Sequence, residues 1–199
     1  VAGILTEDSR VEIKNVGINP LRFGLFEILN EMGAKTKVLQ KYDGVGEPIA
    51  DIVVETSELK GVTVPASIAP RMIDEYPILA VAAACASGTT RMLGLQELRV
   101  KESDRLAAMA SGLQACGVKV EETSDSLTVH GTGGQINGGA LIQTQLDHRI
   151  AMSFLTLGLN AKHPIIIDDG TTINTSFPGF VAIMKSLGAN LDFGDKGKD

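Results

Sequence analysis

Leu113-Gln-Ala-Cys-Gly-Val-Lys119 shares its pattern with two other segments of the chain, Leu29-Asn-Glu-Met-Gly-Ala-Lys35 and Met184-Lys-Ser-Leu-Gly-Ala-Asn190. Each has two apolar positions three residues apart, followed by glycine, a small apolar residue and a polar one. Glycine readily adopts the positive φ that is often needed directly after a helix. We therefore expect a helix to end at each glycine. The three glycines are Gly33, Gly117 and Gly188.

The predicted elements around each glycine follow one order: helix, strand, loop, helix, glycine, strand. The helices that end at the glycines are expected at about Pro20–Met32, Ser103–Cys116 and Phe180–Leu187. Strands are expected before those helices at Arg10–Val16, Thr89–Leu95 and Pro164–Asp168, and after them at Thr36–Leu39, Val118–Glu121 and Asn190–Phe193. The first helices of the units are expected at Tyr76–Ala86 and His148–Asn160, and further strands at Asp51–Glu55 and Ser126–His130. This order predicts an α/β protein of repeated strand–helix units around a shared core.

The start of the chain fits this repeat as a shortened first helix. Val1–Leu5 is apolar, has no N-cap residue before it and does not begin with Met. We expect the first unit to be truncated and the chain to be a piece of a longer polypeptide. The repeat units are expected at about residues 1–70, 71–145 and 146–199.

Composition excludes several classes of protein. The 199 residues are 44% apolar and 21% charged, which is typical of a globular chain and not of a disordered one. The net charge of −6, the 4% aromatic content and the absence of Trp argue against nucleic-acid binding. No apolar run is long enough to span a membrane. Cys85 and Cys116 match no zinc-binding spacing and are expected to be buried free thiols. Together these features predict a cytoplasmic protein.

Asp74 is the first of the candidate site residues. It lies just ahead of the apolar helix 78–86, where a carboxylate can cap the helix and interact with its positive end. Together with Glu75, it forms a pair of adjacent carboxylates that could supply a general base. The local sequence leaves both roles open.

A second cluster runs from Glu97 to Arg105 and holds three cations and three anions in nine residues. Ser103 is the expected N-cap, with Lys101 just outside the helix and Arg105 in its first turn. Cations at a helix N-terminus oppose the helix dipole, and an anionic ligand would relieve that conflict. The alternative is a solvated run of charges.

The third cluster, Asp147-His148-Arg149, also begins a helix. Asp147 is a natural N-cap, whereas Arg149 is another cation at a helix start. Two helix starts with cations, in a chain of negative net charge, favour a site for phosphate or carboxylate. His148 alone is more typical of a structural residue.

These clusters carry a resemblance to a known family. The strings are Asp74-Glu-Tyr-Pro-Ile-Leu-Ala-Val-Ala-Ala-Ala84, Glu97-Leu-Arg-Val-Lys-Glu-Ser-Asp-Arg-Leu-Ala107, Leu146-Asp-His-Arg-Ile-Ala-Met-Ser153 and Thr175-Ser-Phe-Pro178. They resemble the C-terminal portion of the 5-enolpyruvylshikimate-3-phosphate synthases (3-phosphoshikimate 1-carboxyvinyltransferases), and the likeness covers essentially the whole chain. It implies one domain of the enolpyruvyl transferase fold, an inside-out α/β barrel of βαβαββ units.

The resemblance also implies a reaction of the shikimate pathway, in aromatic amino acid biosynthesis. Enolpyruvyl passes from phosphoenolpyruvate to the 5-hydroxyl of shikimate 3-phosphate through a tetrahedral adduct, and phosphate is released without a metal or organic cofactor. The substrates lie between two domains. This chain would thus supply half of the site, with the N-terminal portion of the same enzyme as its partner, and would be inactive alone.

Roles carry over to matching positions as implications of the resemblance. Asp74 corresponds to the carboxylate that binds the 5-hydroxyl and accepts its proton, and Lys101 to a shikimate 3-phosphate contact. Glu102 corresponds to the acid that moves a proton to and from the enolpyruvyl methylene. Arg105 and Arg149 correspond to the clamp for phosphoenolpyruvate, which agrees with the helix-start argument. His148 borders the clamp as a supporting residue.

One position departs from some members of the family. They have a Lys just before the Ser/Thr-Phe-Pro string, and this chain has Thr175 there, so one cation on the phosphoenolpyruvate side is absent. Three alternatives stay open: a UDP-N-acetylglucosamine enolpyruvyl transferase, which would share the fold; a non-catalytic anion-binding half-protein; and an RNA-cyclase-like repeat protein. The last lacks these strings, and the negative net charge disfavours RNA.

Overall fold

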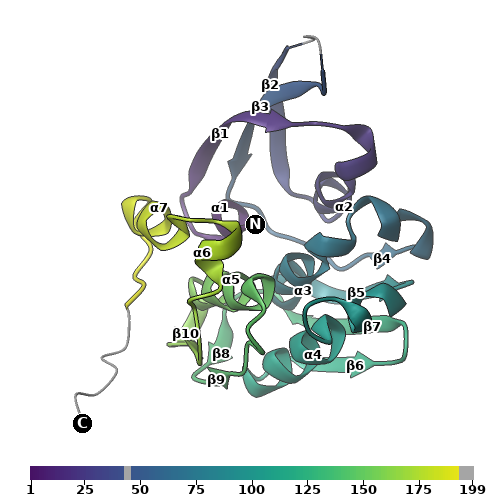
Figure 1. Cartoon of the computed structure of the whole chain (residues 1–199), viewed down its shortest axis with the longest axis vertical. Helices are drawn as coiled ribbons and strands as arrows, with labels where there is room; N and C mark the ends of the chain where they lie inside the picture. Colours follow the sequence, from purple (N-terminus) through teal and green to yellow (C-terminus); the bar gives the residue numbers. More distant parts are fainter. Residues whose placement is uncertain (43–45, 193–199) are drawn as a thin grey trace.

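The computed structural model of the chain describes residues 1–42 and 46–192 (Figure 1). Its α-helices are α1 Ala2–Leu5, α2 Gly24–Glu31, α3 Tyr76–Cys85, α4 Arg105–Ala115, α5 His148–Gly158, α6 Ile173–Ser176 and α7 Phe180–Ser186. Short 3-10 helices are η1 Pro20–Arg22, η2 Ala66–Arg71, η3 Ile73–Glu75 and η4 Gln96–Val100. The strands are β1 Arg10–Gly17, β2 Lys35–Tyr42, β3 Ile49–Glu55, β4 Thr63–Val64, β5 Ser87–Leu93, β6 Lys119–Glu122, β7 Ser126–Thr132, β8 Ile136–Gly138, β9 Leu141–Ile142, β10 Ala161–His163 and β11 Ile166–Ile167.

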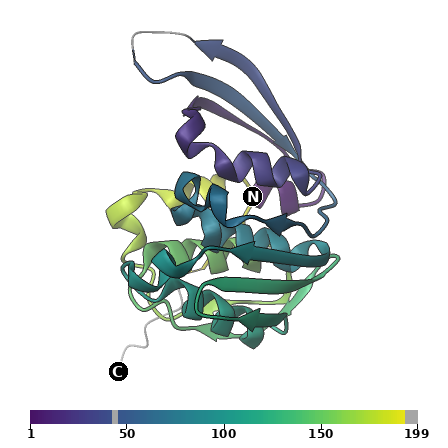
Figure 2. The same ribbon diagram turned by 90° about the vertical axis from the view of Figure 1, so that its right-hand side faces the viewer.

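Two larger sheets share one strand arrangement. The first has the order β1-β3-β2 with antiparallel pairs. The second has the order β4-β5-β7-β6, in which β5, β7 and β6 repeat the arrangement of the first sheet and β4 joins β5 in parallel. Figure 2 shows the first sheet at one end of the molecule and the second towards the other. The remaining strands form two small parallel pairs, β8 with β10 and β9 with β11.

The repeated glycines adopt the conformation expected of them. φ is +97° at Gly33, +85° at Gly117 and +96° at Gly188, and each residue follows the end of a helix. An L-residue with a side chain rarely adopts this left-handed conformation, so the prediction that these glycines end helices is confirmed. The limits of the three repeat units stay a prediction.

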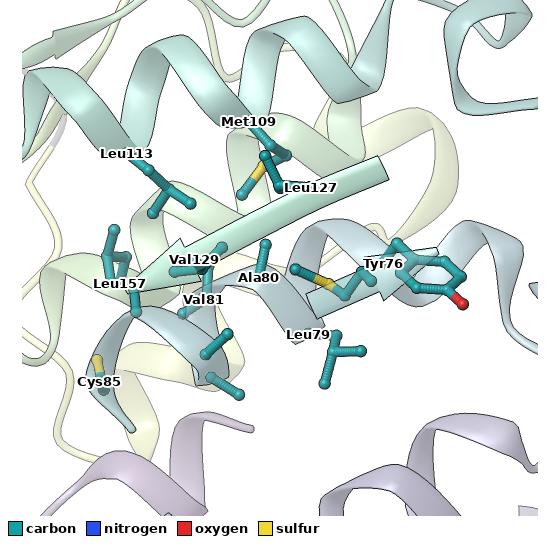
Figure 3. Close-up of a cluster of buried hydrophobic side chains, with 14 of the residues drawn as sticks. Tyr76, Leu79, Ala80, Val81, Cys85, Met109, Leu113, Leu127, Val129 and Leu157 are labelled. Atoms are coloured by element: carbon teal, nitrogen blue, oxygen red, sulfur yellow. The ribbon is translucent and has the colours of Figure 1, made fainter. Parts of the chain in front are cut away.

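Helix α3 is the centre of the core. Nine of its ten residues are buried, because it packs against β5 and β7 of the second sheet and against α2, α4 and α5. Figure 3 shows Leu79 and Val81 of α3 with Leu113 of α4, Val129 of β7 and Leu157 of α5. An apolar helix of ten residues is too short to cross a bilayer, and among the described residues no helix is long and apolar enough to do so.

Both cysteines are buried and free, as expected. Burial raises the pKa of both thiols, that of Cys116 to about 11. Neither thiol is therefore suited to nucleophilic chemistry at neutral pH.

Two expectations about local structure are wrong, and one expected strand is present but shorter. Asp104, not Ser103, caps α4, because its carboxylate accepts the Ala107 N–H at 3.0 Å. Residues 190–192 form no strand, and Phe193 lies outside the described residues. The strand expected at 164–168 has only two paired residues, those of β11, because its neighbour β9 is equally short.

Candidate active site

The three charged clusters of the sequence meet at the amino ends of α3, α4 and α5, which pack against one another (Figure 1). Asp74 lies in η3, directly before α3. Arg105 is the first residue of α4, and Asp147 is the N-cap of α5. Side-chain hydrogen bonds from Arg105 to both carboxylates join the three helix starts into one site.

Arg105 is the centre of this site and is only 1% exposed. Its Nε donates to Asp147 Oδ2 at 2.8 Å and one terminal nitrogen donates to Asp74 Oδ1 at 2.9 Å. The other terminal nitrogen donates to Glu102. A buried guanidinium needs such partners because desolvation of an unpaired charge is costly.

Asp147 is the fixed partner of Arg105. It is fully buried and, besides Arg105, accepts the Ser103 hydroxyl at 3.0 Å and the Arg149 N–H at 2.8 Å. Burial by itself would raise the pKa of Asp147, but these hydrogen bonds outweigh it and hold the pKa below its ordinary value. Asp147 therefore acts as the expected N-cap and also as an ionised anchor for Arg105.

Asp74 lies close to three cations, and no hydrogen bond that would cap α3 is among those its side chain makes with the described residues. Besides Arg105, its carboxylate lies 3.5 Å from Lys101 Nζ and 3.9 Å from a terminal nitrogen of Arg149. Arg149 also donates to the Asp74 backbone carbonyl at 2.9 Å. The side chain of Asp74 remains 41% exposed, so it is held by cations and still open to a ligand.

The outer edge of the site carries further carboxylates. Glu97 binds Lys101 Nζ at 2.6 Å, and this hydrogen bond raises the pKa of Lys101. Glu75 lies 3.7 Å from a terminal nitrogen of Arg149. Burial raises the pKa of Glu75, although the charge of Arg149 acts to lower it. Glu102 is 55% exposed, so its contact with Arg105 can be exchanged at little cost.

These contacts correct the charge argument made from the sequence. In the sequence the cations at the helix starts look unbalanced, whereas in the structure all three are paired with carboxylates. The alternative of a solvated run of charges is also wrong for Arg105, which is buried. An incoming anion would thus have to displace Asp74 and Glu102 from Arg105, while Asp147 stays in place.

Two pockets open onto the site and share Asp74 and Arg149. One has a volume of about 350 Å³ and a mainly polar lining that includes Arg22, Arg71 and Glu75. The other has a volume of about 250 Å³ and a mainly apolar lining that includes Phe177. A small charged ligand with an apolar part could thus reach both side chains.

The two remaining positions singled out in the sequence lie at the margin. His148 begins α5 between Asp147 and Arg149 and is half-buried, and no hydrogen bond of its ring is among those of the described residues. Thr175 lies in α6, where its hydroxyl donates to the Thr172 carbonyl at 2.7 Å.

Sequence reasoning missed the part that two polar residues play in the site. Ser103 is buried and donates to Asp147, a role unrelated to the capping expected of it. Thr144 is fully buried and lies three residues before Asp147. Nothing in its local sequence distinguishes Thr144 from an ordinary loop threonine, because its partner lies 24 residues further along the chain.

Comparisons with known proteins agree with the resemblance. A family model described as EPSP synthase (3-phosphoshikimate 1-carboxyvinyltransferase) matches residues 1–184. The 3-phosphoshikimate 1-carboxyvinyltransferases of Paramagnetospirillum magneticum and Rhodospirillum rubrum are 60% and 57% identical to the chain over 191 residues, which is 96% of this chain. The chain spans 43% and 42% of the length of these curated relatives.

Solved structures agree on the fold. EPSP synthase from Acinetobacter baumannii superimposes with a TM-score of 0.93 at 43% identity, over 96% of this chain and 44% of that one. The enolpyruvyl transferase NikO from Streptomyces tendae, at 20% identity and a TM-score of 0.73, covers 95% of this chain and 41% of that one. The likeness to NikO supports the fold alone, which is that of the enolpyruvyl transferases. On the strength of the family model and these relatives, the chain belongs to the EPSP synthase (3-phosphoshikimate 1-carboxyvinyltransferase) family.

Proposed function

We propose that the chain is one domain of an enzyme that transfers enolpyruvyl from phosphoenolpyruvate to the 5-hydroxyl of shikimate 3-phosphate and releases phosphate. The observation that carries this proposal is the anchoring of Arg105. Its Nε is held by the buried Asp147, while its two terminal nitrogens face the more exposed Asp74 and Glu102. When those two carboxylates move, the terminal nitrogens present a fork for an anion.

The residues around Arg105 support the proposed division of roles. Arg149 lies beside the same carboxylate, so the two guanidiniums can close on phosphoenolpyruvate from two sides. Lys101 contacts the other carboxylate oxygen of Asp74 from the one nearest Arg149, and it would hold shikimate 3-phosphate. His148, between Asp147 and Arg149, would support the clamp.

The chemistry requires three proton transfers, which the two carboxylates of the site can share. Asp74 takes the proton of the 5-hydroxyl while the hydroxyl oxygen attacks C2 of phosphoenolpyruvate. Glu102 delivers a proton to C3. In the second half of the reaction the C–O bond to phosphate breaks and C3 returns a proton to the Glu102 carboxylate, which restores the double bond and releases phosphate. Both carboxylates contact Arg105 in the free protein, so anion binding would release them for this work.

The domain organisation belongs to the same proposal. Residues 1–199 form one domain with units at about 1–70, 71–145 and 146–199, and the N-terminal portion of the same enzyme completes the site. The buried free cysteines support the cytoplasmic location predicted from the sequence, because free thiols persist in a reducing compartment.

A complementation assay tests this function. We expect no phosphate release from the two substrates with the 199-residue chain alone. Turnover should appear when the chain is joined to the portion of the Paramagnetospirillum magneticum relative that lies outside the match. No turnover in the joined protein, or equal turnover with UDP-N-acetylglucosamine as acceptor, would contradict the proposal.

The role of Asp74 is tested in the joined protein. Asp74→Asn keeps an oxygen for the hydrogen bond from Arg105 but removes the base, so turnover should fall by roughly 10²-fold or more, with little change in melting temperature. Asp8→Asn removes the same charge at an exposed residue outside the site and should leave turnover unchanged. Equal turnover in the two variants would exclude Asp74 as the base.

A further inference from the structure

The chain enters the site through a turn that its residues do not favour. The Asp147 N–H donates to the Thr144 carbonyl at 3.0 Å, which closes a four-residue turn. The two central residues, Gln145 and Leu146, have φ of +54° and +58°. Positive φ at both centres is the pattern of a type I′ turn, which favours Asn-Gly, and it is rare for a residue such as Leu. Leu146 is 65% exposed, so burial of its side chain does not explain the conformation.

Thr144, the first residue of the turn, is held by an aspartate from another segment. Asp168 Oδ1 accepts the backbone N–H of Thr144 at 2.9 Å and the Thr144 hydroxyl at 2.7 Å. Asp168 is itself anchored, because its own N–H donates to the Ile142 carbonyl at 3.0 Å at the end of the β9–β11 pair. Thr144 is 0% exposed, so water does not compete for its hydroxyl.

The last residue of the turn is Asp147, the anchor of Arg105. A shift of the turn would therefore move the carboxylate that holds the Nε of Arg105 and the N–H of Arg149. We propose that Thr144 and Asp168 are positioning residues: their hydrogen bonds hold Gln145 and Leu146 in the left-handed turn, and the turn places Asp147 under Arg105. The part of this inference that concerns substrate rests on the proposed function.

The structural part is tested on the 199-residue chain by hydrogen exchange measured with NMR. Thr144→Val keeps the side-chain volume but removes the hydroxyl donor. We expect exchange of the Asp147 amide and of the Arg105 Nε–H to speed up by about fivefold or more, as for loss of one net hydrogen bond. Thr144→Ser keeps the hydroxyl and should retain slow exchange.

A rescue separates control of the turn from general loosening of the core. Adding Gln145→Asn and Leu146→Gly to Thr144→Val supplies residues that favour the turn by themselves, so slow exchange should return. Thr90→Val is the matched control, because Thr90 is equally buried and its hydroxyl has no hydrogen-bond partner among the described residues. Thr90→Val should leave exchange at Asp147 and Arg105 unchanged.

Steady-state kinetics of the joined protein test the consequence for substrate. Because Arg105 and Arg149 are the proposed phosphoenolpyruvate contacts, Thr144→Val should raise the KM for phosphoenolpyruvate about tenfold. The KM for shikimate 3-phosphate should stay within about twofold, since Lys101 is not attached to the turn. Thr144→Ser and the triple variant should recover the KM for phosphoenolpyruvate.

The two hypotheses fail in different ways. If the unmodified joined protein does not turn over, the proposed function is wrong, and the exchange data still decide whether the turn is held as inferred. Unchanged exchange in Thr144→Val, failure of the triple variant to restore it, or an equal rise of both KM values would overturn the positioning role.

Discussion

Arg105 shows how far the meaning of one residue depends on its surroundings. In the sequence it is the last of several alternating charges, a pattern typical of a solvated surface. In the structure it is almost fully buried and bound by three carboxylates that come from three segments. Its first role is therefore structural, and the proposed anion clamp uses the two nitrogens whose partners are exposed.

This burial predicts that neutralising Arg105 destabilises the free protein. Arg105→Gln leaves Asp147 as a buried carboxylate without its cation, and breaking such a pair costs about 3–5 kcal/mol. Lys101→Gln removes a cation whose partners are more exposed, so it should lower the free energy of unfolding by no more than about 1 kcal/mol. If both cations were unpaired and only opposed the helix dipole, neither variant would lower the free energy of unfolding.

Urea denaturation of the two variants distinguishes the two views. A free energy of unfolding for Arg105→Gln within about 1 kcal/mol of the unmodified chain, the range of an exposed pair, would show that Asp147 finds another partner. The m-value should stay constant, so that the comparison concerns stability and not the compactness of the unfolded state.

Among the secondary-structure elements, the contact between α4 and α5 decides how close Arg105 and Asp147 come. Gly112 of α4 faces the ring of Phe154 of α5, and a Cβ at that position would lie 2.2 Å from a ring carbon. Phe154 is fully buried, so its ring has no open space to move into. The absence of a side chain at Gly112 therefore allows the two helices, and the charged groups at their starts, to approach.

We expect Gly112→Ala to destabilise the chain by about 1–3 kcal/mol through overpacking, despite the better helix propensity of alanine. Gly158→Ala, at the end of α5, is the matched control. Its new Cβ would meet Ile165 at 3.8 Å, an ordinary contact, and the change should be neutral or stabilising by up to about 1 kcal/mol. Thermal unfolding of both variants measures the difference, and equal melting temperatures would contradict this account of the helix contact.

At the scale of the whole molecule, β1 differs from the central elements of the fold. Six of its eight residues are exposed, whereas its neighbour β3 is buried in its central five positions and α3 almost throughout. Segments with few buried contacts open at lower free energy than the core. Strand β1, at the edge of the first sheet, is thus expected to open before global unfolding.

Native-state hydrogen exchange in low urea tests this order. Amides of β1 should exchange through a local opening, and those of α3 and β7 only with global unfolding. Residues 1–16 as the most protected segment would contradict the prediction. The site joins α3, α4 and α5, so the hydrogens in its hydrogen bonds should exchange slowly, with global unfolding, as those of α3 do.

Much of the fold could be predicted from local patterns. The glycines at 33, 117 and 188 end helices, the apolar stretch 76–85 forms the buried central helix, and most strands lie where alternation places them. These features depend on residues close in sequence and on the backbone preferences of glycine. The cap of α4 was assigned one residue too early, because Ser103 and Asp104 are both good caps and only the tertiary contact with Asp147 draws Ser103 away.

Local sequence is enough to predict the order of the elements, the three clusters at helix starts and, through long specific strings, the family. The burial of Arg105, its anchoring by Asp147 and the hydrogen bonds from Thr144 to Asp168 depend on the tertiary structure. Arg105 lies 31 residues from Asp74 and 42 from Asp147, and Thr144 lies 24 from Asp168. The burial and partners of a charged side chain depend on which distant segments pack around it, and no local pattern of residues contains that information.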